Sequence, residues 1–262
     1  MTEFSQFLTT HETALRGGVM FSLLILFFVL ERALPRRTQT VSAAHASGNL
    51  LIGLINGVLL RLIVPGGLAA LAFYNQSGGV LGLLALPDWL TFLLALILLD
   101  LVLYWHHRLF HEITFLWHFH GAHHSDRNLN VTSGLRFHPG EALISLSIKA
   151  GAVLLIGAPA VAVIFFEILL NGASLFNHAN WRLGKIDKAL QTLIVTPDMH
   201  RLHQSLAPVE SRMNYGFFLS FWDRLFGSYK AELERAHEHI ELGLHEAEND
   251  SFLAALRHPF TR

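Results

Sequence analysis

Long apolar segments dominate the first two thirds of the chain and limit what it can fold into. Gly17–Leu30 carries no charge, and Leu50–Tyr74 and Trp89–Trp105 hold one charged residue each, Arg61 and Asp100. A run of about 20 mainly apolar residues can cross the hydrocarbon core of a bilayer as a helix. Hydrophobic residues make up 52% of the chain against 15% charged, which is too apolar for an ordinary soluble domain. The sequence therefore predicts an integral, multi-pass membrane protein.

We expect a mostly α fold with about five membrane-embedded helices. Three of them lie within residues 1–105, at about 13–34, 49–74 and 88–105. Two shorter helices follow as a hairpin over 141–177, because the Gly-Ala-Pro sequence in the middle of this apolar stretch is typical of a turn. Residues 230–262 mix charge with a short apolar stretch and are expected to form a C-terminal cytoplasmic cap.

Basic residues predict which side of the membrane each loop occupies. Arg36 and Arg37 follow the first predicted helix, whereas the loop at 75–79 contains no basic residue. Loops rich in Lys and Arg stay in the cytoplasm, so Arg36 is expected inside and the residues after Trp105 are expected inside again. The hairpin must then enter and leave on one side for the histidines before and after it to meet. In a bacterium, this orientation would place the histidines at the cytoplasmic face of the inner membrane.

Histidines cluster directly after the third apolar segment. Seven of the 17 histidines lie within residues 106–124. Residues three or four apart lie on one face of a helix, where two side chains can reach the same ion. This spacing relates His107 to His111, and His120 to His123 and His124. Such pairs indicate metal ligands, although a single pair would be weak support.

Later histidines complete the candidate ligand set. His200 and His203 form an i, i+3 pair where Thr196-Pro197 is typical of a helix start, and His178 stands alone at the end of the hairpin. Eight imidazoles suit two metal ions with four ligands each. Because the chain has no cysteine, any metal must be held by nitrogen and oxygen. The predicted ligands are His107, His111, His120, His123, His124, His178, His200 and His203.

The remaining histidines are interpreted differently. His106 and His118 lie within the cluster but off its spacing, and both readings, ligand or packing residue, stay open. A lone histidine is more often a hydrogen-bonded packing residue, which is the competing interpretation of His178. Six histidines outside the groups are expected to be solvated surface residues: His11, His45, His237, His239, His245 and His258.

Five motifs closely resemble the sterol desaturase/fatty acid hydroxylase superfamily in their order and spacing. The resemblance covers residues 100–229, which would be the catalytic region, about half of the chain. It implies a membrane-embedded, non-haem di-iron oxygenase that acts on lipids. The motifs are HRLFH (107–111), HFHGAHHSD (118–126), RFHPGE (136–141), TPDMHRLHQS (196–205) and NYGFFLSFWDRLFGSY (214–229).

The histidine motifs of the superfamily carry over to this chain with one departure. Its H-x3-H, H-x2-H-H and second H-x2-H-H motifs match His107 and His111, then His120, His123 and His124, then His200 and His203. Gln204 stands where the superfamily usually has its final histidine. A glutamine oxygen is a poorer ligand than imidazole for such a metal, so the resemblance implies that one iron is under-coordinated or that His178 completes its shell.

Carboxylates are candidates for orienting ligand histidines through the second ring nitrogen. Asp100 is favoured, because it lies nearly two helical turns before His107 on the same face and because a carboxylate within a membrane span is costly unless it is paired or functional. For Glu112 and Asp126 a surface salt bridge or a helix cap is an equal alternative, and Glu141 is the fourth candidate. Asp100 and Gln204 are the two predicted catalytic residues beside the ligands.

The resemblance implies a lipid hydroxylase or desaturase that uses two non-haem iron ions and O2 as co-substrate. Oxidising an unactivated C–H bond requires reductive activation of O2, which side chains cannot perform and a redox metal can. The lipid would enter from the bilayer. With no cysteine and no G-x-G-x-x-G fingerprint, the electrons are expected from a separate ferredoxin, cytochrome or flavoprotein. The motif spacing does not distinguish hydroxylation from desaturation.

Three alternatives remain at this point. A carotenoid hydroxylase differs mainly in substrate, and a degenerate member would bind lipid without turnover because of Gln204. A membrane zinc-binding or transport protein would place ionisable residues along a path through the bilayer, whereas the histidines here lie at the ends of the predicted spans. The net charge of −1, with no long block of like charge, argues against a nucleic-acid partner.

Overall fold

Helices are the only regular elements in the part of the chain that the computed structural model describes, apart from three isolated β-bridges. The described residues are 7–8, 10–38, 41–75, 78–232, 236–244 and 251–261. Among them, five helical segments are long and apolar enough to cross a membrane. Four of these are Glu12–Ala33, Asp88–Glu112, Pro139–Ile156 and Ala160–His178. The fifth, Ala43–Leu83, contains more than one helix and includes two residues outside the described ranges. The predicted mostly α membrane fold with about five membrane helices is therefore confirmed.

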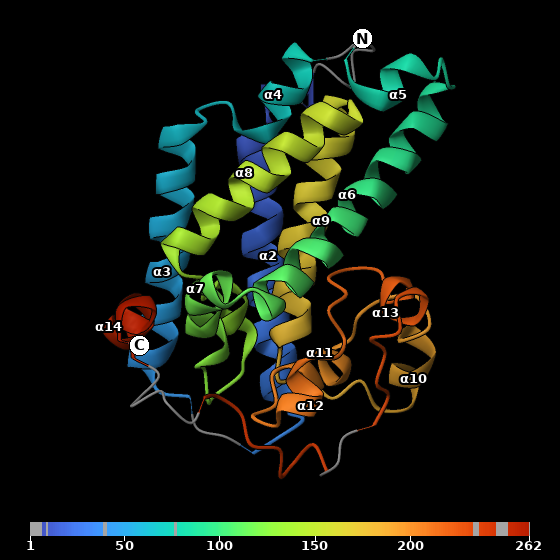
Figure 1. Cartoon of the computed structure of the whole chain (residues 1–262). Coiled ribbons are helices and arrows are strands. Elements are labelled where there is room, and N and C mark those ends of the chain that lie inside the picture. The colour runs from blue at the N-terminus through green and yellow to red at the C-terminus, as the bar shows by residue number, and fades with distance from the viewer. Residues whose placement is uncertain are drawn as a thin grey trace.

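The long helices form a bundle with α9 at its centre, where it packs against α2, α4 and α6 (Figure 1). The bundle consists of α2 (Glu12–Ala33), α3 (Ala43–Ile63), α6 (Asp88–Glu112), α8 (Pro139–Ile156) and α9 (Ala160–His178). Two short helices, α4 (Gly67–Tyr74) and α5 (Gly79–Leu83), lie at one end. The opposite end carries α7 (Thr114–His124), η1 (Val131–Leu135), η2 (Gly184–Ile186), α10 (Asp187–Leu190), α11 (Pro197–His203), α12 (Pro208–Ser211), α13 (Phe221–Leu225), α14 (Phe252–Arg257) and η3 (His258–Phe260).

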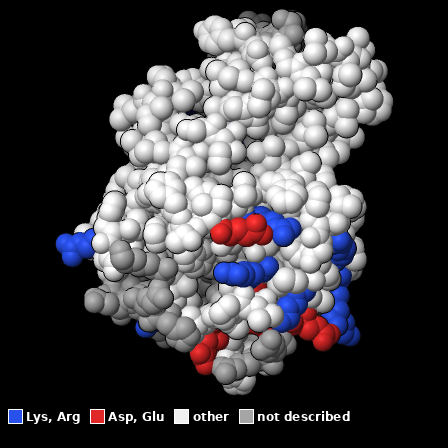
Figure 2. All heavy atoms as spheres, in the orientation of Figure 1, with Lys and Arg blue, Asp and Glu red and all other residues white. Residues whose placement is uncertain are grey.

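Charged side chains are concentrated at one end of the molecule. Figure 2 shows Lys, Arg, Asp and Glu on the lower half, where the short helices α10 and α13 lie, and an almost uncharged surface on the upper half. Large apolar side chains of the long helices are exposed, such as Leu54 of α3 at 63% and Leu155 of α8 at 73%. Apolar surface of this extent suits contact with lipid rather than with water.

The second predicted span is broken where Pro65 and two glycines interrupt it. The expectation of one helix over 49–74 is corrected, because α3 ends at Ile63 and α4 begins at Gly67. Proline supplies no N–H to the helix, and Gly67 has a φ of +66°, which only glycine adopts without strain. Helix α3 instead begins earlier than expected, at Ala43, where the Ser42 side chain accepts a hydrogen bond from the His45 N–H.

Helix α6 continues seven residues beyond the expected end at Trp105. Its 25 residues contain neither glycine nor proline, so nothing stops it until Ile113, whose backbone is extended. The last turns of this helix therefore carry His107 and His111, which the sequence had placed after the span.

The hairpin expected at 141–177 corresponds to α8 and α9. Gly157 ends α8 with a φ of +72°, and Pro159 precedes α9. A Cβ at Gly157 would lie 2.0 Å from the carbonyl oxygen of Gly78, so glycine is also required by the close approach of the loop before α5. The hairpin begins after His138 and ends at His178, at the same end of the bundle, as the sequence argument requires.

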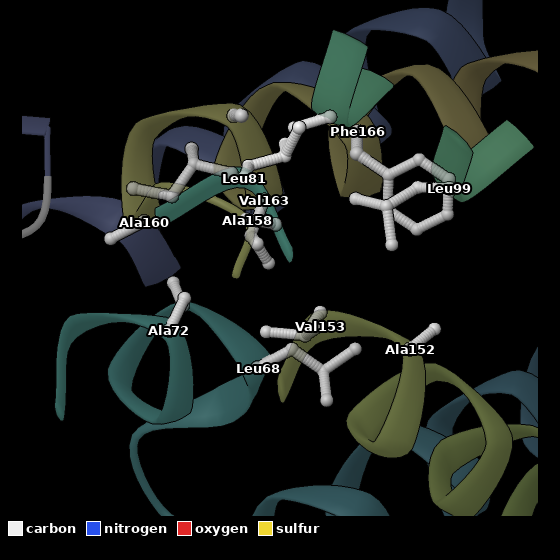
Figure 3. Close-up of a cluster of buried hydrophobic side chains, with 14 of the residues drawn as sticks. Leu68, Ala72, Leu81, Leu99, Ala152, Val153, Ala158, Ala160, Val163 and Phe166 are labelled. Carbon is white, nitrogen blue, oxygen red and sulfur yellow. The ribbon is translucent and has the colours of Figure 1, made fainter. Parts of the chain in front are cut away.

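Apolar packing and polar contacts stabilise different ends of the bundle. Figure 3 shows the main apolar cluster, in which Leu68 of α4, Leu99 of α6, Val153 of α8 and Val163 of α9 pack together. At the other end, the Glu31 carboxylate accepts hydrogen bonds from the backbone N–H groups of Val131 and Asn180, at 2.9 and 3.0 Å. The apolar cluster therefore stabilises one end of the bundle, and the hydrogen bonds of Glu31 stabilise the other.

The C-terminal segment covers α7 and α3. Helix α14 packs against both, and η3 packs against α7. A Cβ at Gly121 of α7 would lie 2.4 Å from Nε2 of His258, so the C-terminal segment packs in close contact with α7 at this point.

Candidate metal centre

The structure brings all eight predicted ligand histidines together at one end of the bundle. They come from four helices, and every one is buried. Helix α11 begins at Pro197 after Thr196, whose hydroxyl accepts a hydrogen bond from the Met199 N–H, as the sequence predicts. The four helices α6, α7, α9 and α11 converge, because α7 packs on α6 and α11 packs on α9.

The eight histidines form two groups of five and three instead of four and four. Within each group, one nitrogen from every ring lies within 4.8 Å of the others. The first group comprises His107, His111, His120, His124 and His203, and the second comprises His123, His178 and His200. The two groups adjoin each other, since the ring centroids of His123 and His124 are 5.5 Å apart.

Helix geometry explains the division. Residues four apart face the same direction, so the pairs His107/His111 and His120/His124 each contribute two rings to the first group. His123 is displaced from His124 by about 100° around α7, since a helix has 3.6 residues per turn, and it therefore faces the second group.

Backbone and carboxylate acceptors orient the rings of the five-histidine group. Nδ1–H of His107 donates to the carbonyl of Tyr215, that of His203 to the carbonyl of Met213, and that of His120 to Oε1 of Glu141, each at 2.8 Å. A ring that donates from Nδ1 leaves the lone pair of Nε2 free for a metal. Among the described residues, none forms a hydrogen bond with Nε2 of His111, His120, His124 or His203.

The three-histidine group is built around His178. Its Nδ1–H donates to the carbonyl of Ser174 at 2.6 Å, and its Nε2 lies 3.0 Å from Nε2 of both His123 and His200. Neutral rings that face one another through nitrogen lone pairs repel unless a proton or a cation lies between them. The expectation that His178 joins the cluster therefore agrees with its position.

Gln204 occupies the fourth side of the three-histidine group. Its Nε2 lies 2.8 Å from Nε2 of His123 and 3.3 Å from Nε2 of His200. Its Oε1 is buried and has no hydrogen-bond partner among the described residues. A half-turn of the amide exchanges the two atoms, so this side chain can offer either an N–H donor or an oxygen ligand to the group.

Burial favours the neutral form of four of these histidines, His123, His124, His200 and His203. It lowers the pKa of His124 well below the ordinary value, and the neighbouring His111 and His120 lower it further. Burial, followed by the neighbouring His178, lowers the pKa of His123 and of His200 in the same way. Burial lowers the pKa of His203 to about 3, although its bond to the Met213 carbonyl opposes the shift. Neutral imidazole is the form that binds metal, so these ligands need not lose a proton first.

The residues present fit two metal ions. In the first group the Nε2 atoms of four rings are buried without a hydrogen-bond partner among the described residues, and an unsatisfied buried acceptor costs about 1–3 kcal/mol. In the second group the Nε2 atoms of three rings face one another, with 3.0 Å between His178 and each of the other two. Imidazole suits Fe, Zn, Cu and Ni, whereas Mg and Ca prefer oxygen ligands. The donor set alone thus selects a transition metal without selecting which one.

The structure corrects the expectation that Asp100 orients His107. Oδ2 of Asp100 accepts hydrogen bonds from the Trp222 indole N–H at 2.9 Å and from the Leu219 backbone N–H at 3.2 Å. The His107 ring is held by the Tyr215 carbonyl instead. Asp100 is therefore paired, as a carboxylate within a span must be, but it fixes the segment after Tyr215 against α6.

The other three carboxylate candidates have different partners. Glu141 does contact a candidate ligand, His120, as expected. Glu112 is exposed and pairs with Arg108, which is the salt-bridge alternative. Asp126 accepts a hydrogen bond from the Ser133 hydroxyl at 2.6 Å and lies 3.3 Å from Nε2 of His45. Hydrogen bonding and the charges of His45 and Arg136 hold the pKa of Asp126 at about 2, despite its burial.

The surface interpretation of the other histidines is partly wrong. His45 and His258 are buried, because α14 and η3 cover α3 and α7. His11 and His239 are exposed as expected, whereas His237 is half-buried beside Asp198. His245 lies outside the described residues.

The two histidines left open both have their own surroundings. Nε2 of His106 lies 2.9 Å from the Ser145 hydroxyl, and His118 is half-buried. Neither belongs to the two metal groups.

Sequence reasoning missed the backbone carbonyls that orient the ligands. The carbonyls of Tyr215, Met213 and Ser174 accept from ligand histidines, and no side chain reveals such a role. The only sequence signal was that Tyr215 lies within the NYGFF motif, whose function the motif spacing did not explain.

Comparison with known proteins points to one family. The fatty acid hydroxylase family model matches residues 92–228. An ornithine lipid hydroxylase from Rhizobium tropici is 32% identical, over 64% of this chain and 50% of that protein. An alkylglycerol monooxygenase from Danio rerio is 32% identical, over 55% of this chain and 32% of its own length. A putative Δ7-sterol-C5(6)-desaturase from Arabidopsis thaliana is 26% identical, over 53% of this chain and 48% of that protein.

This chain thus matches half or less of the length of each of these curated relatives. No solved structure matches it. The family match begins within α6 and ends just after α13, so it includes every histidine of the two metal groups.

Proposed function

Since this chain belongs to the fatty acid hydroxylase family, we propose that it is a membrane oxidoreductase that uses O2 to hydroxylate or desaturate a C–H bond of a lipid. The observation that carries this proposal is the pair of adjoining, buried imidazole groups at one end of an apolar bundle. The named activities of the relatives support the same reaction class, because they are a lipid hydroxylase, a monooxygenase and a desaturase.

Two iron ions are the proposed cofactors. Both groups offer nitrogen ligands that iron accepts, and iron, when bound, supplies the redox chemistry that activates O2, which side chains cannot supply. The first ion would be held by His107, His111, His120, His124 and His203, and the second by His123, His178 and His200 with Gln204 beside them.

The protein's own contribution is to fix and shield these ligands. Glu141 and the carbonyl groups of Tyr215 and Met213 set the ring orientations of three ligands in the first group. Burial of all eight rings keeps bulk water away from the centre. Mutation of such hydrogen-bond partners of ligand side chains, here called outer partners, typically lowers metal affinity or activity by about 10- to 100-fold.

The basic loop after α2 supports a cytoplasmic location for the centre. Arg36 lies in this loop, and its guanidinium binds the Asp198 carboxylate at 3.0 Å, two residues before His200. The loop and the metal groups therefore occupy the same end of the molecule. If basic loops stay inside, the centre faces the cytoplasm, where a soluble ferredoxin, a cytochrome or a flavoprotein would deliver electrons.

A transport function is less well supported. Four charged residues of the spans pair with one another, since Arg16 contacts Glu167 of α9 at 2.8 Å and Arg61 contacts Glu12 at 3.1 Å. Paired charges of this kind tie α2, α3 and α9 together, and they do not require a path for an ion.

Iron content tests the cofactor proposal first. The protein is purified in detergent from cells grown on iron-57, and metal per chain and Mössbauer spectra are recorded. About two coupled iron ions per chain are expected. Zinc alone, in protein grown with ample iron and handled without oxygen, would contradict the oxygenase and favour a metal-handling protein.

Lipid analysis tests the reaction itself. Membranes from cells that express the wild-type chain are compared with membranes from cells that express His124→Ala, by mass spectrometry of total lipids. A lipid that gains 16 mass units or loses 2 only with the wild-type chain is expected, which corresponds to insertion of one oxygen atom or removal of two hydrogen atoms. Identical lipid profiles, with iron present, would leave a lipid-binding protein without turnover as the better description.

A further inference from the structure

An apolar groove lies in the membrane part of the protein, between α6, α9 and the segment 217–219. Its volume is about 290 Å³, and ten of its eleven lining residues are apolar. The exception is Asp100, whose carboxylate is already bound by the Trp222 indole and the Leu219 backbone. The groove therefore offers apolar surface with almost no free polar group.

The wall formed by α6 leads to the first metal group. Leu93, Leu96, Asp100 and Leu103 line the groove at spacings of three and four residues, so they share one face of the helix. His107 follows Leu103 by four residues and lies on this same face, about 6 Å further along the axis. From Leu93 to Leu103 the wall is about 15 Å long.

The opposite wall leads to the second metal group. Phe166 and Leu170 of α9 line the groove. The same i, i+4 series continues with Ser174, whose carbonyl accepts from His178, and then with His178 itself. The two walls thus extend from the membrane interior to a ligand of each metal group.

The third wall is tied to both groups by hydrogen bonds. The Asn177 side-chain amide donates to the carbonyl of Phe217 at 2.8 Å, directly before His178 in the chain. Two residues before Phe217, the Tyr215 carbonyl orients His107. Asp100 holds Leu219 against α6. A molecule in the groove would therefore lie beside residues that position both metal groups.

We propose that this groove binds one alkyl chain of an intact bilayer lipid and presents it to the metal centre. The inference deepens the proposed function and relies on it for the identity of the reaction. Leu93 is 45% exposed at the lipid-facing rim, so a chain can enter sideways from the bilayer. Among the described residues that line the groove, none is cationic, and Asp100 would repel a carboxylate. A free fatty acid would lack a partner there, whereas an intact lipid keeps its headgroup outside.

Photo-crosslinking in lipid nanodiscs tests the groove directly. The probe is phosphatidylcholine with a diazirine in the middle of one acyl chain, and crosslinked peptides are identified by mass spectrometry. Crosslinks are expected within 93–103, 166–170 and 217–219. Leu170→Trp and Leu96→Trp fill the groove from opposite walls, and each should lower this crosslinking about tenfold, since contact area for several methylene groups is lost.

The matched control is Leu54→Trp, which adds the same ring to an exposed leucine of α3 outside the groove. It should leave crosslinking unchanged. Equal crosslinking in Leu170→Trp, Leu96→Trp and wild-type protein would overturn the proposal. A second probe, palmitic acid with the same diazirine, separates the two lipid sources. Groove crosslinks from palmitic acid without any from phosphatidylcholine would overturn the assignment to an intact lipid.

Failure of the groove and failure of the oxygenase have different signatures. Crosslinking needs no turnover, so groove crosslinks in a protein without iron would support the groove and contradict the proposed function. Lipid oxidation that persists at the wild-type level in both tryptophan variants, with two iron ions bound, would support the function and contradict the groove.

Discussion

The two metal groups differ in redundancy. The first has five imidazoles from α6, α7 and α11, and three of these rings are oriented by acceptors at 2.8 Å. The second has three imidazoles from α7, α9 and α11, with Gln204 in the place of a fourth. Among the described residues, none pairs with Nδ1 of His200. We infer from this difference that a metal ion in the second group would depend more strongly on each of its ligands.

Removing a ligand from the smaller group should have the largest effect. His178→Ala leaves two imidazoles and the amide, so we expect about one iron per chain to be lost. Lipid oxidation should fall at least about 100-fold, because loss of an outer partner alone costs about 10- to 100-fold. Iron analysis and product formation measure both effects.

His124→Ala is the matched variant in the larger group. It leaves four imidazoles and should retain more iron than His178→Ala, although lipid oxidation is also lost. If His178→Ala kept both iron ions, His178 would be a packing residue and the comparison between the groups would fail.

Glu141 tests whether outer partners matter in the larger group. Glu141→Ala removes the acceptor of His120 Nδ1–H, so iron affinity should fall by about 10- to 100-fold. Glu141→Gln retains an oxygen at the same position and should lose less. Affinity is measured by competition with a chelator of known strength. Equal losses in the two variants would show that charge, and not ring orientation, is what Glu141 supplies.

Gln204→His should make the two groups more alike. A fourth imidazole would strengthen the smaller group, and we expect iron affinity of that group to rise by about tenfold, since imidazole is a better ligand than an amide oxygen. The Mössbauer signal of the second ion should become more intense in protein purified with limiting iron. An unchanged signal would mean that the amide already serves as a ligand.

His239→Ala should have the smallest effect. This residue is exposed and belongs to neither group, so iron content and lipid oxidation are expected to match the wild-type values. Loss of iron in this variant would show that the C-terminal segment also binds metal. The comparison would then have to include a third group.

Much of the site was accessible from the sequence because helical periodicity is local. The spacing of His107 to His111 and of His120 to His124 follows from 3.6 residues per turn, wherever the helix lies. The spans follow from apolar length, since the bilayer fixes the length of helix that it can hold. The division of the second span into two helices at Pro65 was not predicted.

Other features depend on residues far apart in the chain. Asp100 contacts Trp222, and His258 is buried against α7, because loops and the C-terminal cap fold back onto helices that are distant in sequence. No local pattern encodes such contacts. The same holds for the backbone carbonyls of Tyr215 and Met213, since every residue has a carbonyl.

The sequence by itself determined the membrane helices, the candidate ligand residues and the family, because each depends on composition, spacing or motif order over short distances. Only the tertiary structure decided the division into five and three, the position of Gln204 in the smaller group and the groove between α6 and α9. The physical reason is that a ligand's group depends on the direction its helix face takes relative to three other helices, and helix packing sets that direction.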